Sequence, residues 1–522
     1  MRHLFLLLTL LPTISTLQIV FYLLLIAKSH IDFTDSLINT LVEKGHTVDL
    51  IIARLNSHVT VNGTDKIDRR YGYGFTADSP WSKTPYLLEP FKKRVRTFTE
   101  HTHFMRITTE LCEIGLSDPG LHEFMKTRKY DVGIVSEYEY CGFALFDHYK
   151  IPSIASFNSL AVLDQQAISA GLPNPAAVTH SIVDAEDTTK LYGRFWNLLN
   201  WAHINFFVYP YCQQHSLEVI HKYLNPNIKL DRIIQSIDIN FINSNELIER
   251  PRPISHKMKY IGGINLRKPK VLDEETERIM ALPAKGAVIF CFGTQVPSAV
   301  FPKNIRQSFV NAINQFPEYN FIWKYEKQPG DDEIFKNSTN LYLMKWLPQT
   351  DLLYDSRTKG FISHVGLNSY LEASYAGVPI LAVPLIVDQP HNAMSGEAIG
   401  TTYVLDKTDL TTENIVKGIK AMLYDQRYTL NAKRVAKMLQ DRPNTPQSIL
   451  TDWVEFIGAN PLLHQNLNQP GVDMSVFTYY SMDVISISLS VIMIISYISY
   501  RLIIRLVSKI GKLRGDRKQK IQ

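Results

Sequence analysis

Cysteine is scarce in this sequence, with four residues among 522: Cys112, Cys141, Cys212 and Cys291. They lie far apart and form no Cys-x-x-Cys pair, so the usual ligand spacing of a zinc site is absent. A disulfide framework is not indicated, although a single bridge stays open. Cys141 and Cys291 lie in apolar, strand-like surroundings, which predicts that both are buried thiols.

Two nucleotide-related motifs are also missing. No Asp-x-Asp triplet occurs, which removes the usual clamp for a Mg²⁺-bound sugar nucleotide, and we predict no metal site and no cofactor. Gly72-Tyr73-Gly74 lacks the third glycine and the preceding strand of a dinucleotide-binding loop. We find no repeat of fixed period and no low-complexity segment.

The basic excess of the chain is local. The net charge is +5, but the stretch 501–522 holds eight Lys/Arg and one acid, Asp516, which amounts to +7 and leaves about −2 for the rest. The body therefore offers no nucleic-acid surface. A chain of 522 residues with 45% hydrophobic and 20% charged residues is too long for one ordinary domain and suits two folded domains.

The N-terminus resembles a targeting segment. Residues 1–16 combine a basic start, the apolar run Leu4–Leu11 and small residues, which predicts a cleaved signal peptide. A signal anchor is the alternative, because Leu17–Ala27 is apolar too. We interpret that second run as the first buried strand of the mature protein.

A membrane span is predicted near the C-terminus. Val484–Tyr500 contains no charge and extends to Ile504 if Arg501 snorkels, which predicts a span over 484–504. The basic tail 505–522 follows, so the positive-inside rule places the tail in the cytosol and the body in the lumen. Sequons at Asn62 and Asn337 agree with a lumenal body. Lys518 and Lys520 resemble an endoplasmic-reticulum retrieval signal; the alternative is a solvated basic tail.

Apolar runs alternate with helical patterns through the body, which predicts an α/β fold with parallel sheets. Strands are expected at 17–26, 48–53, 132–135 and 241–243, a helix at 33–44, and an irregular section at 165–225. In the second half strands are expected at 287–292, 321–325, 341–344, 360–363 and 380–383. The predicted division is a first domain at 17–250, a linker at 251–284, a second domain at 285–455 and a connecting segment at 456–483.

The stretch 341–393 carries the chemistry. His364 is expected at a strand-to-helix turn, and Gly366 is expected to open a helix whose N–H groups and dipole suit a phosphate. His364, Asn368 and Glu372 are spaced four apart and share one face of that helix. A diphosphate beside His364 and a ribose beside Glu372 fit this order, while Trp346 offers a flat surface for a base and Gln349 a polar contact.

These residues resemble the signature of the UDP-glucuronosyl/UDP-glucosyltransferase family. The resemblance rests on Trp346-Leu347-Pro348-Gln349, Ser363–Ser369, Glu372 and Asp388–Ala393, and extends from about Leu17 to Ile504. It implies the GT-B fold, with two Rossmann-like domains facing a cleft, and a metal-independent inverting transfer. A UDP-sugar would then be a co-substrate, and a small lipophilic molecule the acceptor.

The family's roles carry over by position. Trp346 and Gln349 would hold uracil, Glu372 the ribose, and His364 with the amides around Gly366 the diphosphate. Asp388 and Gln389 would bond sugar hydroxyls, and the loop that contains Thr294 resembles a phosphate-contacting loop. The residues predicted to bind the donor are Thr294, Trp346, Gln349, His364, Gly366, Asn368, Ser369, Glu372, Asp388 and Gln389. Val365 stands where the family has glycine or alanine, and we expect it to crowd the diphosphate.

His30 is the predicted catalytic base. It follows the first strand, precedes the expected helix, and Ser29-His30 resembles the family's Ser-His pair; histidine suits proton removal near neutral pH. The family's orienting acid aligns with Ser136, so we favour Glu137, with Glu139 or no acid as alternatives. His46 is expected to be structural.

Three functions remain open from the sequence. The first is glucuronate transfer to a lipophilic acceptor, in the lumen of the endoplasmic reticulum. The second changes the donor to UDP-glucose. The third is a catalytically impaired homologue that binds UDP-sugar or modulates partner transferases. A homo- or hetero-oligomer is compatible with all three, and a two-carboxylate glycosidase would have no use for a nucleotide site.

Overall fold

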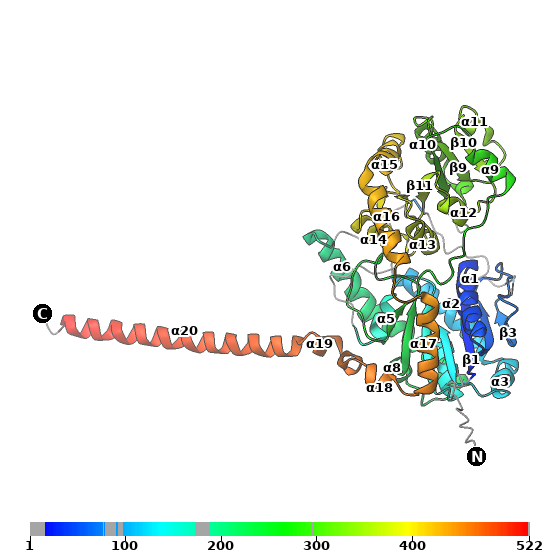
Figure 1. Cartoon of the computed structure of the whole chain (residues 1–522). Coiled ribbons are helices and arrows are strands. Elements are labelled where there is room, and N and C mark those ends of the chain that lie inside the picture. The colour runs from blue at the N-terminus through cyan, green and yellow to red at the C-terminus, as the bar shows by residue number, and fades with distance from the viewer. Residues whose placement is uncertain are drawn as a thin grey trace, which may run out of the picture. The chain divides into compact units, whose positions relative to one another are not determined.

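The computed structural model of the chain describes residues 16–76, 78, 90–91, 98–172, 188–293 and 296–519. Nearly all of the expected signal peptide therefore lies outside the described residues. The chain divides into two compact units, residues 1–468 and 469–522. The first unit holds two parallel sheets with helices around them (Figure 1).

The first sheet has seven strands in the order β3-β2-β1-β4-β5-β6-β7, and every adjacent pair is parallel. Its strands are β1 Gln18–Leu25, β2 Thr47–Arg54, β3 Arg69–Gly74, β4 Val132–Ser136, β5 Ser153–Asn158, β6 Ile237–Ile242 and β7 Met258–Tyr260. The central strand β1 is apolar without interruption because both faces are covered. Val20, Tyr22 and Leu24 face one apolar cluster, and the residues between them face another.

The helices of the first half are α1 Lys28–Glu43, α2 Phe98–Leu116, α3 Pro119–Lys126, α4 Cys141–His148, α5 Asp164–Ser169, α6 Leu191–His203, the π-helical turn η2 Ile204–Val208, α7 Tyr209–Tyr223 and α8 Leu230–Gln235. The expectation of irregular structure over 165–225 is wrong for 191–223, which is helical throughout. Residues 173–187 of that section lie outside the described residues.

The second sheet has six parallel strands in the order β10-β9-β8-β11-β12-β13, the order of a dinucleotide-binding fold. Its strands are β8 Ala287–Cys291, β9 Asn320–Lys324, β10 Leu341–Met344, β11 Thr358–Ser363, β12 Ile380–Ala382 and β13 Thr402–Val404. The five expected strands are confirmed, and β13 is an addition. The helices around it are α9 Glu274–Met280, η3 Ser298–Val300, α10 Lys303–Ile313, α11 Asp332–Phe335, α12 Gln349–Tyr354, α13 Leu367–Ala376, α14 Gln389–Ala398, α15 Thr412–Tyr424 and α16 Gln426–Gln440.

At both predicted domain boundaries, a segment assigned outside the first domain packs on the first half. The expected linker 251–284 contributes β7, the last strand of the first sheet, as well as α9. Helix α17, Pro446–Ala459, returns to the first half, where Leu450 and Val454 join the apolar cluster around Phe21. The chain therefore crosses between the halves twice, and α18, His464–Leu467, completes the first unit.

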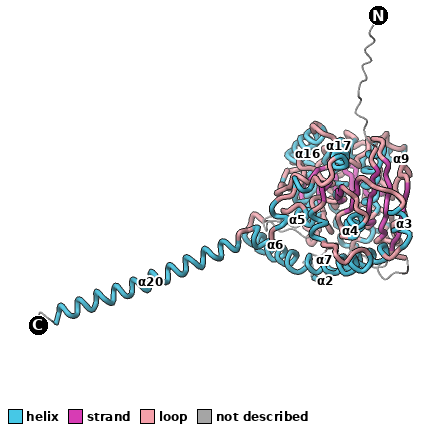
Figure 2. The backbone as a smooth tube through the Cα atoms, turned by 90° about the horizontal axis from the view of Figure 1, so that it is seen from below, coloured by secondary structure: helices cyan, strands magenta, loops and turns pink. Residues whose placement is uncertain are grey.

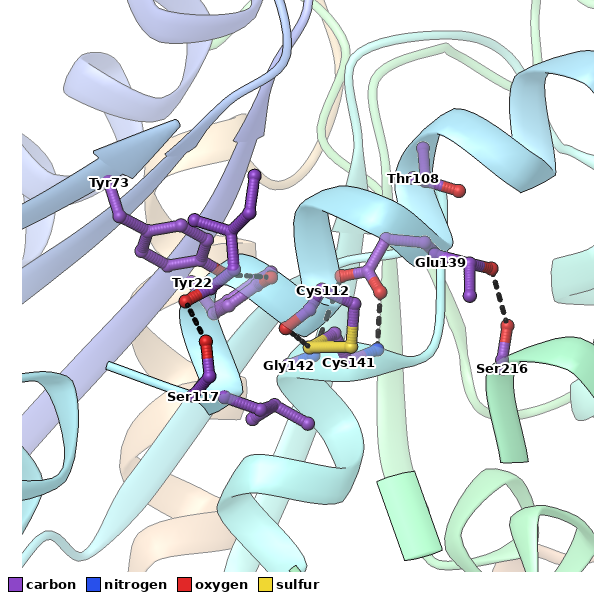
Figure 3. Close-up of a disulfide and its surroundings, with 12 residues drawn as sticks. Tyr22, Tyr73, Thr108, Cys112, Ser117, Glu139, Cys141, Gly142 and Ser216 are labelled. Carbon is purple, nitrogen blue, oxygen red and sulfur yellow. Dashed lines mark hydrogen bonds between the residues drawn. A yellow bond between two sulfur atoms is a disulfide. The ribbon is translucent and has the colours of Figure 1, made fainter. Parts of the chain in front are cut away.

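Cys112 and Cys141 form a disulfide that joins α2 to the start of α4 (Figure 3). The prediction of a buried thiol at Cys141 is wrong. Cys291, at the end of β8, is a buried free thiol as expected. Sequence spacing could not reveal the bridge, because the helices that carry the two cysteines are distant in the chain and adjacent only in the fold.

The second unit consists of η4 Pro470–Asp473, α19 Val476–Tyr479 and α20 Met482–Gln519. Figure 2 shows α20 as one uninterrupted helix. Its stretch Met482–Leu513 is long and apolar enough to cross a membrane, with a mean hydropathy of 1.9 over an 18-residue window. This helix contains the predicted span 484–504 and continues into the basic tail.

Candidate functional site

In each sheet, predicted site residues follow the two adjacent strands from which the strand order runs outward in opposite directions. In the first sheet the chain winds outward in both directions from β1 and β4, and in the second from β8 and β11. Open parallel sheets bind ligands outside the carboxyl ends of strands at such a point. His30 follows β1, Glu137 follows β4, Gly293 follows β8 and His364 follows β11.

The His364 imidazole lies between two glycine-containing loops. A Cβ atom at Gly293 or at Gly366 would come within 2.8 Å or 2.7 Å of His364 Nε2, so both positions require glycine. Burial lowers the pKa of His364 to about 4, which leaves the ring neutral at neutral pH. A neutral imidazole can donate one N–H, and the N-terminus of α13 begins beside it at Gly366. Thr294 lies outside the described residues.

Val365 is strained and does not act as expected. Its φ is 55°, in the left-handed region that disfavours a β-branched residue. Its side chain is fully buried in the apolar cluster that contains Leu367 and Ala393, so it packs into the core. The expected crowding of the diphosphate is therefore replaced by backbone strain, of about 1–3 kcal/mol for such a conformation. Val387, directly before Asp388, has the same φ of 55°.

Gln349, Ser369 and Glu372 contact one another. The Gln349 amide donates to Ser369 Oγ at 3.1 Å and also to Glu372, and Thr350 Oγ1 donates to the other Glu372 oxygen at 3.0 Å. Burial raises the pKa of Glu372. The expected ribose acceptor is thus paired with the expected uracil contact in this structure.

Asn368 directly precedes Ser369 on the same helix. Its Oδ1 accepts a hydrogen bond from Asn265 Nδ2 at 3.2 Å. Asn265 follows β7, so the segment that returns from the first sheet touches the predicted donor helix.

Lys324 is a candidate that the sequence analysis missed. It ends β9 at the same edge of the sheet, donates to the Gly293 carbonyl at 2.9 Å and lies 4.8 Å from the centroid of the Trp346 ring. The Trp346 side chain is 66% exposed, which leaves it accessible to a base. Lys324 also contributes to the lowered pKa of His364, so its charge reaches the expected diphosphate position. The sequence offered one signal for Lys324 as a site residue, its position at the end of an expected strand.

Asp388 and Gln389 begin α14 and are buried. Asn392 Nδ2 donates to Asp388 Oδ2 at 2.7 Å and to the Val365 carbonyl at 3.0 Å, which ties this helix to the His364 loop. Burial raises the pKa of Asp388. Gln389 Oε1 accepts from two backbone amides, so its side-chain amide group is the part that remains for a ligand.

His30 lies in the first turn of α1, because the helix begins at Lys28 and not at Phe33 as expected. Its ring stacks on Tyr138, with the two centroids 5.2 Å apart. Its Nδ1 is buried and has no hydrogen-bond partner among the described residues. Burial lowers the pKa of His30 to about 4, so the imidazole is neutral at neutral pH.

Neither predicted acid holds His30. Glu137 accepts hydrogen bonds from Ser156, Ser169 and Asn240 at 2.6, 3.0 and 3.2 Å, which directs its carboxylate into a buried polar network. The orienting role predicted for Glu137 therefore has no supporting contact. Ser136 pairs in regular register with Phe157, so β4 contains no bulge that would exchange the two positions.

Glu139, the other candidate, is turned toward α4. Its carboxylate accepts from the backbone N–H groups of Cys141 and Gly142, beside the disulfide (Figure 3). Burial raises the pKa of Glu139 to about 7. His46 is structural as expected, since its Nδ1 accepts from Leu17 N at 3.3 Å and its Nε2 lies 3.3 Å from Glu455.

Tyr138 belongs to the first half and lies near Asp388 of the second half. Burial raises its pKa, and the charge of Asp388 adds to the effect, which places these two side chains near each other. The first half supplies His30 and Tyr138, and the second half supplies Asp388. The Tyr138 hydroxyl accepts a hydrogen bond from Ser159 N at 2.9 Å, which fixes the ring on which His30 stacks.

Known proteins resemble this chain over most of its length. The family model described as UDP-glucoronosyl and UDP-glucosyl transferase matches residues 22–516. UDP-glucuronosyltransferase 1A8 of Rattus norvegicus is 26% identical over 495 residues, with 91% of this chain and 89% of the relative covered. UDP-glucosyltransferase 2 of Dactylopius coccus is 24% identical, with 88% and 87% covered.

Solved structures share the fold. The glycotransferase of kitacinnamycin aligns with a TM-score of 0.62 at 14% identity, covering 84% of this chain and 98% of that protein. Phytolacca americana UGT2, complexed with UDP-2fluoro-glucose and pterostilbene, aligns with a TM-score of 0.54 at 12% identity, covering 85% and 100%. The expected GT-B arrangement of two parallel sheets is confirmed.

Proposed function

Because this chain belongs to the family of UDP-glucuronosyl and UDP-glucosyl transferases, we propose that it moves glucuronate from UDP-glucuronate to a small lipophilic acceptor. We propose that the transfer inverts the anomeric centre and needs neither a metal ion nor a cofactor. The observation that carries the proposal is the convergence of His364, Lys324 and the start of α13 at the second sheet, with His30 supplied by the first.

The donor would extend along the carboxyl edge of the second sheet. Trp346 supports uracil, Glu372 accepts from the ribose hydroxyls, and Asp388 and Gln389 hold the sugar. The ribose would replace the Gln349 amide on Glu372, which frees that amide for the polar edge of uracil. One hydrogen bond, from Gln349 to Glu372, would thus give way to two contacts with the nucleotide.

Three groups with positive charge or N–H donors would contact the leaving diphosphate. Lys324 brings a full charge, His364 one N–H, and α13 its unpaired N-terminal amides. Charge that develops on UDP as the glycosidic bond breaks is stabilised by these groups. Together with the missing Asp-x-Asp motif, this supports a metal-independent reaction, for which activity in the presence of EDTA is the direct check.

His30 would remove the proton from the acceptor hydroxyl as that oxygen attacks the anomeric carbon. A neutral imidazole is competent for this step at neutral pH, but its lowered pKa makes it a weak base. Acceptors with acidic protons, such as phenols and carboxylic acids, therefore suit this site better than aliphatic alcohols.

The unpartnered His30 Nδ1 favours a second candidate, a catalytically impaired homologue that binds UDP-sugar. A UDP-glucose donor is the third candidate, in line with the Dactylopius coccus relative. Purified full-length protein, incubated with UDP-glucuronate, UDP-glucose and a panel of phenols, distinguishes all three by product mass. Glucuronide products support the proposal, glucosides change the donor, and UDP binding without either product identifies the impaired homologue.

We also propose residence in the membrane of the endoplasmic reticulum, with the body lumenal and the tail cytosolic. The helix α20 and the basic residues that follow Tyr500 support this orientation. Protease added to sealed microsomes should trim only the tail; digestion of the whole body would reverse the orientation. Replacing both Lys518 and Lys520 by serine should let the protein leave the endoplasmic reticulum if they form a retrieval signal.

A further inference from the structure

Residues 265–270, which we call the 265–270 segment, follow β7 of the first sheet and lie against α12 and α13 of the second half. Asn265 Nδ2 donates to Asn368 Oδ1 on α13 at 3.2 Å. Two later residues of the segment bind the first turn of α12. Since α12 and α13 carry the predicted contacts to uracil and ribose, a part of the expected linker borders the candidate nucleotide site.

The main contact of the segment is a bidentate ion pair between Arg267 and Asp351. Arg267 Nη1 donates to Asp351 Oδ1 at 2.5 Å, and Nη2 donates to Oδ2 at 2.6 Å. The backbone N–H of Lys270 donates to the same Oδ1 at 2.6 Å. The Asp351 side chain is buried, whereas that of Arg267 is 42% exposed. A bidentate pair fixes direction as well as distance, so the segment holds Asp351 in one orientation.

The same turn of α12 is held from its other side by Glu372. Gln349 and Thr350, the two residues before Asp351, both donate to the Glu372 carboxylate through their side chains. The first turn of α12 therefore lies between two charged partners, Arg267 of the segment and Glu372 of α13. A shift of this turn would move Gln349 away from its predicted position beside uracil.

Arg267 also acts on Glu372 through its charge. Burial raises the pKa of Glu372, while the bonds from Gln349 and Thr350 and the charge of Arg267 lower it. Three further titratable groups interact electrostatically with Glu372: Asp351 and Tyr354 of α12 and Cys291 of β8. Arg267 supplies the positive charge in this set. An ionised carboxylate accepts hydrogen bonds from both ribose hydroxyls, whereas a protonated one must donate its own proton.

We propose that Arg267 is a positioning residue of the nucleotide site, which holds the first turn of α12 through Asp351 and keeps a positive charge near the ribose acceptor Glu372. The inference rests on the proposed donor site, in which the ribose replaces the Gln349 amide on Glu372. The charge of Arg267 does not depend on that exchange, so it supports the ionised carboxylate before and after the nucleotide binds. Arg267 acts through Asp351 and Glu372 and needs no contact with the nucleotide itself.

Calorimetric titration of the purified full-length protein with UDP, between about pH 5 and pH 8, tests the proposal. Arg267→Met removes the charge and both bonds to Asp351, and Arg267→Lys keeps the charge without the bidentate geometry. The matched control is Arg357→Met. Arg357 is 36% exposed and makes two bonds of 2.7 Å to Glu277, but it precedes β11 and so lies at the opposite edge of the same sheet.

We expect Arg267→Met to bind UDP about threefold to tenfold more weakly than wild type at neutral pH. As the pH is lowered, the affinity of this variant should begin to fall at a higher pH than that of wild type, because Glu372 without its neighbouring cation takes up a proton more readily. Arg267→Lys should follow the wild-type pH profile, and Arg357→Met should match wild type throughout. The phosphate of UDP also titrates, at about pH 6, but it does so for every variant, so the profiles are compared between proteins.

Wild-type affinity and an unchanged pH profile in Arg267→Met would overturn the proposal. A loss of equal size at every pH, shared by Arg267→Lys, would overturn it too, because Arg267 would then act through packing alone and not through its charge. A wild-type protein that binds no UDP would be a different result, since it would overturn the proposed donor site and, with it, the premise of this inference.

Discussion

The ring of His30 stacks on the ring of Tyr138, at 5.2 Å between centroids, and no carboxylate among the described residues bonds the buried His30 Nδ1. A histidine base usually gains basicity and orientation from a carboxylate that stabilises the imidazolium. For the proposed base His30, an aromatic ring would supply the orientation alone. Tyr138 would then be a positioning residue, and the missing carboxylate would limit how strong a base His30 can be.

Removing that ring should disorder the base. We expect Tyr138→Ala to lower kcat on a phenol by about tenfold to a hundredfold while the affinity for UDP stays unchanged. Tyr138→Phe keeps the stacking face and should retain most of kcat, although it loses the hydrogen bond from Ser159. Steady-state kinetics of both variants decide the matter, and a Phe variant as slow as the Ala variant would show that the hydroxyl matters instead.

Lys324 should contribute to diphosphate binding and not to nucleoside binding. We expect Lys324→Met to weaken UDP by about 1.5–3 kcal/mol, because a hydrogen bond between two charged groups is lost. Uridine, which has no phosphate, should bind wild type and variant equally. Calorimetric titration with both ligands separates the two effects, and an equal loss for uridine would mean that the variant merely displaces Trp346.

Glu372 should contribute to ribose binding. We expect Glu372→Ala to weaken UDP binding by about 1–3 kcal/mol, because the charge-assisted bonds to the ribose hydroxyls disappear. A 2′,3′-dideoxy nucleotide lacks those hydroxyls, so it should bind wild type and variant with similar affinity. Unchanged UDP affinity in a folded variant would remove Glu372 from the site.

The strands could be predicted from sequence because parallel strands covered on both faces are continuous apolar runs. Gln18–Leu25 and Ala287–Cys291 are such runs. Helices α6 and α7 were missed for the opposite reason, since the apolar side chains of α6 face outward and its inner face contains Gly193 and Asn197. The usual rule that apolar spacing marks the core fails on such a helix.

The candidate site could be predicted where a motif is contiguous, as from Ser363 to Glu372. Contacts between segments that are distant in the sequence could not be predicted. Two examples are the Cys112–Cys141 disulfide and the hydrogen bond from Lys324 to Gly293. The direction of a side chain was also beyond the sequence. Glu137 follows β4 as expected, but its carboxylate turns toward β5 and β6 instead of His30.

Two buried neutral histidines should make stability depend on pH. In the folded state the pKa of His30 and of His364 is about 4, against 6.5 for the unfolded chain. Between these values the unfolded state binds more protons, so the free energy of unfolding falls as the pH falls from 6.5 toward 4. Each histidine contributes up to about 3 kcal/mol of that loss.

Buried carboxyl groups such as Glu139 act in the opposite direction, so the comparison must be made between variants. The double variant His30→Gln, His364→Gln should lose less Tm than wild type when the pH is lowered from 7 to 5. Thermal unfolding at a series of pH values measures this difference. Parallel curves for the two proteins would show that neither histidine has a lowered pKa.

His30→Ala should abolish transfer to a phenol and leave the affinity for UDP nearly unchanged. His30 belongs to the first half, whereas the expected UDP contacts from Trp346 to Glu372 belong to the second. Loss of a general base typically costs about 10²–10⁴ in rate. The loss should be smaller for a carboxylic acid, which is already ionised at neutral pH and needs no deprotonation.

The matched control is His46→Ala. His46 accepts from the backbone of Leu17 and contacts Glu455, so its removal should lower Tm or yield while each folded molecule retains its kcat. Measuring kcat for a phenol and for a carboxylic acid in both variants separates the roles. If His30→Ala keeps the wild-type kcat on the phenol, the base lies elsewhere. The stacked pair His30–Tyr138 would then be a packing feature of the first half, and the preference for acidic acceptors would lose its physical reason.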